Sequence, residues 1–142
     1  MITLRQLLVS LGFFASSAAF GQNITYQVDG NAYEGYYVSP AVNAPLVVIL
    51  HDWDGLTDYE IRRADMLKQQ GYAVFAADLF GKGVRPTADK DKMQHTGALY
   101  QDRTKLRTLI QAGIDTAKAQ GANVNNAVVM GYCFGGAAVL EH

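Results

Sequence analysis

The first half of the chain alternates short apolar runs with turn residues, a pattern that predicts β-strands. Residues 24–38, ITYQVDGNAYEGYYV, contain two aromatic and β-branched runs on either side of Asp29-Gly30-Asn31. Such a turn accepts positive φ angles and favours a hairpin of antiparallel strands. Residues 46–50 then form a continuous aliphatic run, which is expected for a strand that is buried on both faces.

A helical spacing of apolar residues follows the buried strand. Thr57 and Glu60 have the spacing of a capping box, and apolar residues then recur on one helical face as far as Leu67, before Gly71. This pattern predicts a helix. Residues 72–77 are again strand-like.

The middle of the chain is polar and is expected to be a loop. Glycines and a proline punctuate residues 81–86, and the polar composition continues through His95, so we expect a mobile segment without regular structure. From Asp102 onward, apolar residues recur once more at helical spacing, and Gly121 ends that pattern. A second amphipathic helix is therefore predicted.

The last elements complete an alternation of strands and helices. Residues 125–130 are an apolar strand-like run, and the Ala-rich residues 134–140 predict the first turns of a helix. We therefore expect an α/β fold over residues 22–142, with a mostly parallel sheet and helices on both faces. In such sheets the functional sites lie at the carboxyl ends of the strands.

The N-terminal residues have the pattern of an export signal. Arg5 precedes a nearly uninterrupted apolar stretch over residues 7–20, and Ala19-Phe20-Gly21 supplies small residues at the spacing that signal peptidase accepts. The apolar stretch is shorter than the roughly 20 residues that span a membrane. We therefore expect residues 1–21 to be a cleaved signal peptide and the mature protein to be periplasmic or secreted, without a stable membrane anchor. An uncleaved tether and a helix of the domain are the alternatives.

Composition excludes several classes of protein. The chain has 142 residues, of which 49% are hydrophobic, and a formal net charge of -1, which is typical of a globular domain and gives no bulk attraction for nucleic acid. The single cysteine cannot form an internal disulfide. A thiol oxidoreductase is also disfavoured, because no second cysteine is present to resolve a mixed disulfide.

The lone cysteine lies in VVMGYCFGG, residues 128–136, directly after the third apolar strand. A strand, a sharp turn with glycines and a helix make up a nucleophile elbow, here with Cys133 in place of serine. A helix that begins at Phe134 would favour the thiolate, and the Phe134 N–H would stabilise an oxyanion. The alternative is that Cys133 is a small buried hydrophobic residue.

Three loops at strand ends are expected to come together: HDWDG at residues 51–55, DLFGKG at residues 78–83 and GYCFGG at residues 131–136. Their aromatic residues either line an apolar substrate pocket or belong to the core; they are Trp53, Phe80, Tyr132 and Phe134.

Neither a cofactor nor a metal is expected. The glycines do not fit the dinucleotide-binding pattern G-x-G-x-x-G. His51, Asp52, Asp54 and Asp58 are candidate metal ligands by type, but H-D-x-D matches no strong ligand spacing.

The motifs HDWDGL, DLFGKG and GYCFGGA, in this order, resemble those of the dienelactone hydrolase family of the α/β-hydrolase fold, and the first hairpin is also similar. The resemblance implies that Cys133 is the nucleophile and that the amides of Phe134 and Trp53 form the oxyanion hole. It places Asp52, which is one methylene shorter, where the family has a glutamate that helps to activate the cysteine. The implied substrate is a small ester or lactone.

The resemblance also implies substrate contacts. Lys82 falls near an arginine that binds a substrate carboxylate, although a lysine lacks the bidentate fork of arginine. Tyr132, next to the nucleophile, is a second candidate substrate-binding residue.

The family's catalytic Asp and His lie downstream of the nucleophile, whereas this sequence ends nine residues after Cys133. We therefore expect the N-terminal part of the fold, with the C-terminal part missing. His142 would be carried away from the elbow along its helix, His95 is expected to be solvated in a loop, and His51 is expected to be structural. The alternative function is a truncated or degenerate hydrolase fragment without activity.

Overall fold

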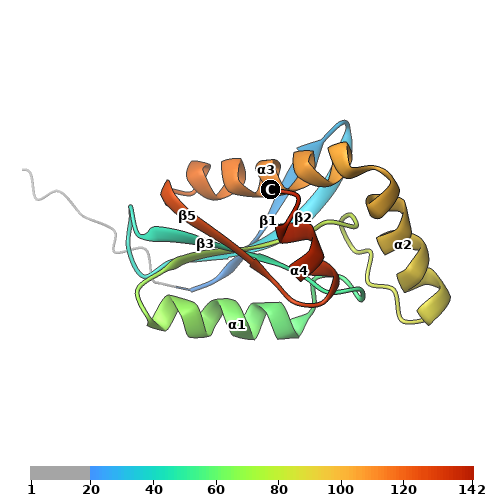
Figure 1. Ribbon diagram of the computed structural model, residues 1–142. Coiled ribbons are helices and arrows are strands. Elements are labelled where there is room, and N and C mark those ends of the chain that lie inside the picture. Colours follow the sequence, from blue (N-terminus) through green and yellow to red (C-terminus); the bar gives the residue numbers. More distant parts are fainter. Residues whose placement is uncertain (1–19) are drawn as a thin grey trace, which may run out of the picture.

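The computed structural model describes residues 20–142 and shows a five-stranded sheet with four helices. The expected signal peptide lies almost entirely outside the described residues, because it covers residues 1–21. Figure 1 shows the elements in chain order: β1 (Gln22–Val28), β2 (Asn31–Val38), β3 (Pro45–Leu50), α1 (Asp58–Gln69), β4 (Ala73–Ala77), α2 (Asp89–Gln101), α3 (Arg103–Ala119), β5 (Asn123–Gly131) and α4 (Phe134–Val139).

The sheet is mixed, with the strand order β1-β2-β4-β3-β5. β3 pairs in parallel with both β4 and β5, whereas the pairings β1-β2 and β2-β4 are antiparallel. The sheet combines the two predicted parts, because the antiparallel hairpin joins the parallel strands β3, β4 and β5 in one sheet. The α/β architecture itself is confirmed.

The hairpin turn has the backbone that the sequence predicted. Asp29 and Gly30 have φ angles of 49° and 77°. Two successive positive φ angles match the twist of the flanking antiparallel strands. The β1-β2 register follows directly, with Val28 opposite Asn31.

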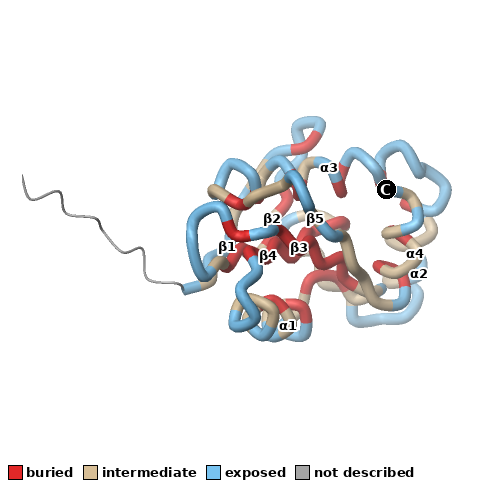
Figure 2. The backbone as a smooth tube through the Cα atoms, turned by 60° about the vertical axis from the view of Figure 1, so that its left-hand side comes forward, coloured by how far each residue is buried: buried red, intermediate tan, exposed pale blue. Residues whose placement is uncertain are grey.

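Helices cover both faces of the sheet, as expected. Figure 1 shows α1 on one face and α3 with α4 on the other. Successive residues of a strand point to opposite faces, so β4 places Phe75 against the core on the α3 side and Val74 against the core on the α1 side. In Figure 2 the buried backbone is concentrated in the central strands between these layers.

The first helix begins with the predicted capping box. The buried Glu60 carboxylate accepts hydrogen bonds from the Thr57 backbone N–H at 2.8 Å and from the Thr57 hydroxyl at 2.9 Å. The Tyr59 N–H in turn donates to the Thr57 hydroxyl oxygen. These bonds satisfy donors at the helix start and fix where the loop after β3 enters α1.

The polar middle segment is a helix, so the expectation of a loop through His95 is wrong. In α2, Leu99 is the only fully buried residue, which explains why no apolar periodicity marked the helix in the sequence. Ala88 precedes it without a side-chain cap, and Asp102 then accepts a hydrogen bond from the Lys105 N–H at 2.9 Å to start α3. Two helices therefore fill the region between β4 and β5. Within residues 20–142, no helix is both long and apolar enough to cross a membrane.

Candidate active site

Cys133 occupies a strained turn between β5 and α4. Its φ and ψ angles are 52° and −114°, and it is exposed. A non-glycine residue in such a conformation costs on the order of 1–3 kcal/mol, and such residues cluster at functional sites. The alternative of a small buried hydrophobic cysteine does not hold, and the strand-turn-helix arrangement of an elbow is present.

Glycines allow this turn to form against neighbouring backbone. A Cβ atom at Gly135 would overlap the carbonyl oxygen of Leu50 and lie 2.6 Å from that of His51. A Cβ atom at Gly131 would overlap the backbone of Gly135 and lie 2.8 Å from the Gly136 nitrogen. Only residues without a side chain fit at these two positions, so the start of α4 lies directly on the end of β3.

His51 is fully buried at this junction and is neutral. Its Nε2 accepts a hydrogen bond from the Leu79 N–H at 3.0 Å, so the proton is on Nδ1, which donates to the Asp52 carbonyl oxygen at 2.7 Å. Burial lowers the pKa of His51 to about 4. Because both ring nitrogens are occupied, His51 has the structural role that the sequence suggested and is not available as a general base.

Two carboxylates follow His51 in the loop after β3. The Asp54 N–H donates to Asp52 Oδ1 at 3.1 Å. Burial, and then the neighbouring Asp54 carboxylate, raise the pKa of Asp52 to about 6, whereas the hydrogen bond with Asp52 lowers that of Asp54. Asp52 can therefore exchange a proton close to neutral pH.

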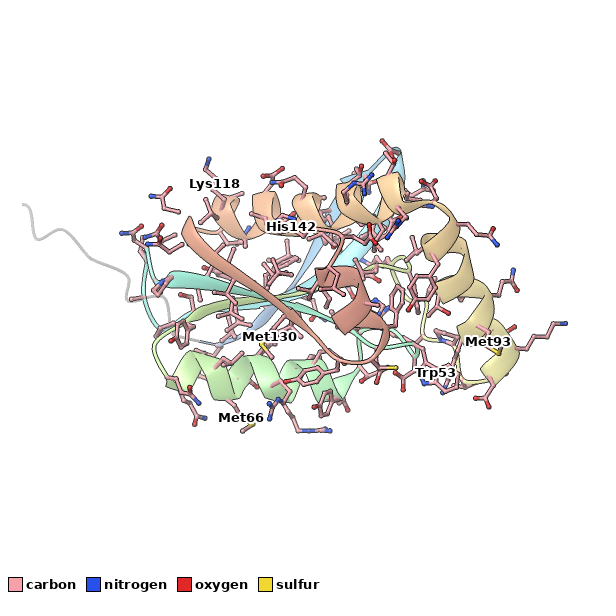
Figure 3. The ribbon with its side chains drawn as sticks, viewed as in Figure 1. Trp53, Met66, Met93, Lys118, Met130 and His142 are labelled. Carbon is pink, nitrogen blue, oxygen red and sulfur yellow. The ribbon has the colours of Figure 1, made fainter. Side chains whose placement is uncertain are left out.

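Trp53 lies between these two carboxylates and is 36% exposed. The Lys92 ammonium of α2 lies over its ring, with Nζ 4.8 Å from the ring centroid. Figure 3 shows Trp53 at the same end of the molecule as Met93, the next residue of α2. The oxyanion role of the Trp53 amide remains a prediction.

Phe134 has a buried side chain, so its ring belongs to the core. The ring contacts Phe80 and Tyr100, with centroids 5.8 Å and 5.4 Å away. The Phe134 N–H is one of the first N–H groups of α4, which have no acceptor within the helix. A buried ring thus holds this amide at the turn, consistent with the predicted oxyanion role.

Tyr132 points to α1. Its hydroxyl oxygen accepts a hydrogen bond from Arg63 Nε at 3.0 Å, and its ring meets that of Tyr59 edge-on. The hydrogen bond to Tyr132 raises the pKa of Arg63. Tyr132 therefore has protein partners already, and its predicted contact with substrate remains a prediction.

Lys82 is engaged with the N-terminal hairpin. Its Nζ donates to Thr25 Oγ1 at 2.8 Å and lies 3.0 Å from Glu34 Oε2. The hydrogen bond between Lys82 and Glu34 lowers the pKa of the Glu34 carboxyl. A substrate carboxylate would have to compete with these groups for Lys82, and its binding role remains a prediction.

Sequence reasoning missed the buried Asp78, which shapes the loop after β4. Its Oδ1 accepts from the N–H groups of Phe80 and Gly81, both at 3.0 Å, and its Oδ2 accepts from the Glu34 N–H at 3.1 Å. An aspartate directly after a buried strand and three residues before a glycine is a signal of such a loop.

Sequence reasoning also missed the contribution of α2 to the site. His95 is partly buried on this helix, and its ring stacks on that of Phe80 with centroids 5.1 Å apart. It is therefore not a solvated loop residue. Because the residues of α2 that face the site are polar or aromatic, only their spacing, and not their hydropathy, could have revealed them.

The other candidates are not gathered at the turn. His142 is exposed and lies beside α3, far from Trp53 in Figure 3. Among residues 20–142, no group of three or more histidine, cysteine, aspartate or glutamate side chains is arranged to hold a metal ion.

Comparisons with known proteins agree with these features. The sequence model of the dienelactone hydrolase family matches residues 33–142. Protein usf of Aquifex pyrophilus is 27% identical over 121 residues, which cover 82% of this chain and 52% of that protein. The chain thus spans about half the length of this relative.

Solved structures show the same fold. A protein named m3DLH is 31% identical, with a TM-score of 0.80 over 86% of this chain and 52% of its own. A dienelactone hydrolase-like promiscuous phosphotriesterase from metagenomic libraries is 28% identical, with a TM-score of 0.78 over the same shares.

We predict that His51 makes stability depend on pH. Its folded pKa of about 4 lies below the 6.5 of a solvent-exposed histidine, so the folded state resists protonation. The contribution of His51 to stability is therefore complete above about pH 6.5 and is lost as the pH falls toward 4. Between about pH 7.5 and pH 5 the loss is on the order of 2 kcal/mol. Asp52 opposes this loss, because its raised pKa favours the folded state in acid, so the contribution of His51 is measured by comparison with a variant that keeps Asp52.

Urea unfolding of the wild type and of His51→Gln at these two pH values measures this effect. The variant is less stable at the higher pH but loses less on acidification. Equal losses in both proteins would show that another group carries the pH dependence.

We also predict that Gly135→Ala displaces the turn, whereas Gly136→Ala is a matched control. A Cβ at Gly136 would lie 3.4 Å from the Gly131 oxygen, a contact that a small shift relieves. The expected result is a loss of more than about 3 kcal/mol for Gly135→Ala, against less than about 1.5 kcal/mol for the control, by urea unfolding. Similar losses would mean that the backbone yields at Gly135.

Proposed function

Because the chain belongs to the dienelactone hydrolase family, we propose that it is a hydrolase that cleaves ester or lactone bonds with Cys133 as its nucleophile. The observation that carries this proposal is the backbone of Cys133, whose φ of 52° exposes the side chain at the start of α4. A small-molecule ester or lactone is the proposed substrate. Because the chain spans about half the length of its relatives, activity and substrate of the whole protein are part of the proposal.

The proposed reaction begins with attack of the Cys133 thiolate on the substrate carbonyl carbon. Negative charge develops on the carbonyl oxygen, where the amides of Phe134 and Trp53 would stabilise it. The carbon–oxygen bond of the ester then breaks, the alcohol leaves with a proton, and a thioester remains. Water hydrolyses the thioester, releasing the acid and restoring the thiol. No cofactor takes part in this scheme.

Asp52 is proposed to assist in forming the thiolate. Its pKa of about 6 allows it to take up and release a proton near neutral pH. Lys82 and Tyr132 are proposed to contact the substrate, which requires Lys82 to leave Glu34 and Tyr132 to leave Arg63.

We further propose that the protein is exported, to the periplasm or to the medium, after removal of residues 1–21. In support, β1 begins at Gln22, so cleavage before this residue would leave every strand intact. N-terminal sequencing of protein from the native host is expected to start at Gln22. A mature protein that starts at Met1 would contradict export by cleavage.

We predict that p-nitrophenyl acetate acetylates the protein once, at Cys133. Release of p-nitrophenol should be stoichiometric in its first phase, and intact mass should increase by one acetyl group. Cys133→Ala should abolish both signals, and Cys133→Ser should acylate at least about 100-fold more slowly, because an unactivated hydroxyl is a far weaker nucleophile than a thiolate.

The unfolded protein in urea is the matched control, because it retains the thiol but not the turn. If the folded protein reacts no faster than the unfolded chain, the nucleophile proposal is wrong. The alternative, a hydrolase fragment without catalytic activity, would then hold.

A further inference from the structure

One face of α2 contacts all three loops of the candidate site. Lys92 lies over Trp53 in the loop after β3, and His95 stacks on Phe80 in the loop after β4. Near the C-terminal end of the same helix, the Tyr100 ring meets the Phe134 ring edge-on at the start of α4. The two contacts at the ends of this face are therefore made to the two residues whose amides would form the oxyanion hole.

Lys92 contacts Trp53, the residue that carries the relevant amide, and its charge reaches Asp54, the residue that follows. Its Nζ lies 4.8 Å from the Trp53 ring centroid, and its charge also contributes to lowering the pKa of Asp54, the next residue. Among residues 20–142, Lys92 forms no ion pair with a carboxylate within 4.0 Å. The indole is thus the principal contact of the Lys92 ammonium.

The contact with Lys92 covers part of a side chain that is otherwise open to solvent at one side. The indole is 36% exposed, and the loop continues through Gly55 with a φ of 86°. A cation over the face of an indole is attracted by the ring quadrupole, so the ammonium limits how far the side chain, and with it the backbone of Trp53, can rotate. A displacement of an oxyanion donor by about 1 Å costs up to about 100-fold in rate.

We propose that Lys92 is a positioning residue that holds the Trp53 amide in the orientation required to stabilise the oxyanion. The inference builds on the proposed function, since it requires that Cys133 attack a carbonyl. It assigns to α2 a role in transition-state stabilisation, exerted through the Trp53 side chain and not by contact with the substrate.

The test compares two reactions of the same thiol. Acylation by p-nitrophenyl acetate develops an oxyanion, whereas alkylation by iodoacetamide displaces iodide from carbon and develops none. The ratio of the two rate constants therefore isolates the contribution of the oxyanion donors. Trp53 is the only tryptophan of the chain, so its fluorescence reports directly on the Lys92 contact.

Three variants of the full chain suffice. In Lys92→Met we expect acylation to fall roughly 10- to 100-fold, alkylation to stay within about twofold of the wild type, and the Trp53 emission spectrum to change. Lys92→Arg keeps a cation over the ring and should restore most of the acylation rate. Lys90→Met, at an exposed position of the same helix, should match the wild type.

The outcomes separate this inference from the proposed function. If the wild type is acylated but Lys92→Met is unaffected, or loses both reactions equally, the positioning role is wrong and the nucleophile stands. If the wild type is not acylated at all, no oxyanion forms and both proposals fall together. The role of Lys92 is supported if Lys92→Met loses acylation selectively, Lys92→Arg restores it, and Lys90→Met shows no such loss.

Discussion

The ends of three elements meet around a single buried, uncharged imidazole, and the geometry of the site depends on it. His51 accepts from the Leu79 N–H and so ties the end of β3 to the loop after β4. The imidazole and the Phe80 ring meet edge to face, with centroids 4.6 Å apart. The backbone carbonyl oxygen of His51 packs against Gly135 and leaves no room for a side chain there. A charged imidazolium could not accept from Leu79, so the neutral form is a condition of this arrangement.

A buried carboxylate near this imidazole is compensated by hydrogen bonds and by a nearby cation. Asp78 is fully buried, but backbone N–H groups surround its oxygens, and Arg85 lies 3.6 Å from Oδ1. Buried charge is tolerated under these conditions, because each oxygen keeps hydrogen-bond partners in place of water. Asp52 is partly buried beside Asp54, and this burial, followed by the Asp54 carboxylate, raises the pKa of Asp52 to about 6.

Features of the fold and of the site that depend on a few neighbouring residues could be predicted from the sequence, whereas features that depend on distant residues could not. The capping box at Thr57, the turn at Asp29 and the glycines around Cys133 are each specified within a few residues, and the structure shows all three as expected. α2 was missed because its one buried apolar residue gives no periodicity. The partner of Lys82 was missed because Glu34 lies far away in sequence and meets it only when the hairpin joins the sheet.

The strand order has a consequence for how the chain folds. β5 is the last strand along the sequence, yet it pairs with β3 across α1, β4, α2 and α3. Pairings between such distant segments form slowly, since a long loop must close before any contact rewards it. The unusual backbone of Cys133 exists only once β5 has docked and Gly135 lies on the end of β3. Any reactivity that the turn confers on the thiol therefore requires that β5 is paired with β3, and it is absent while β5 is still unpaired.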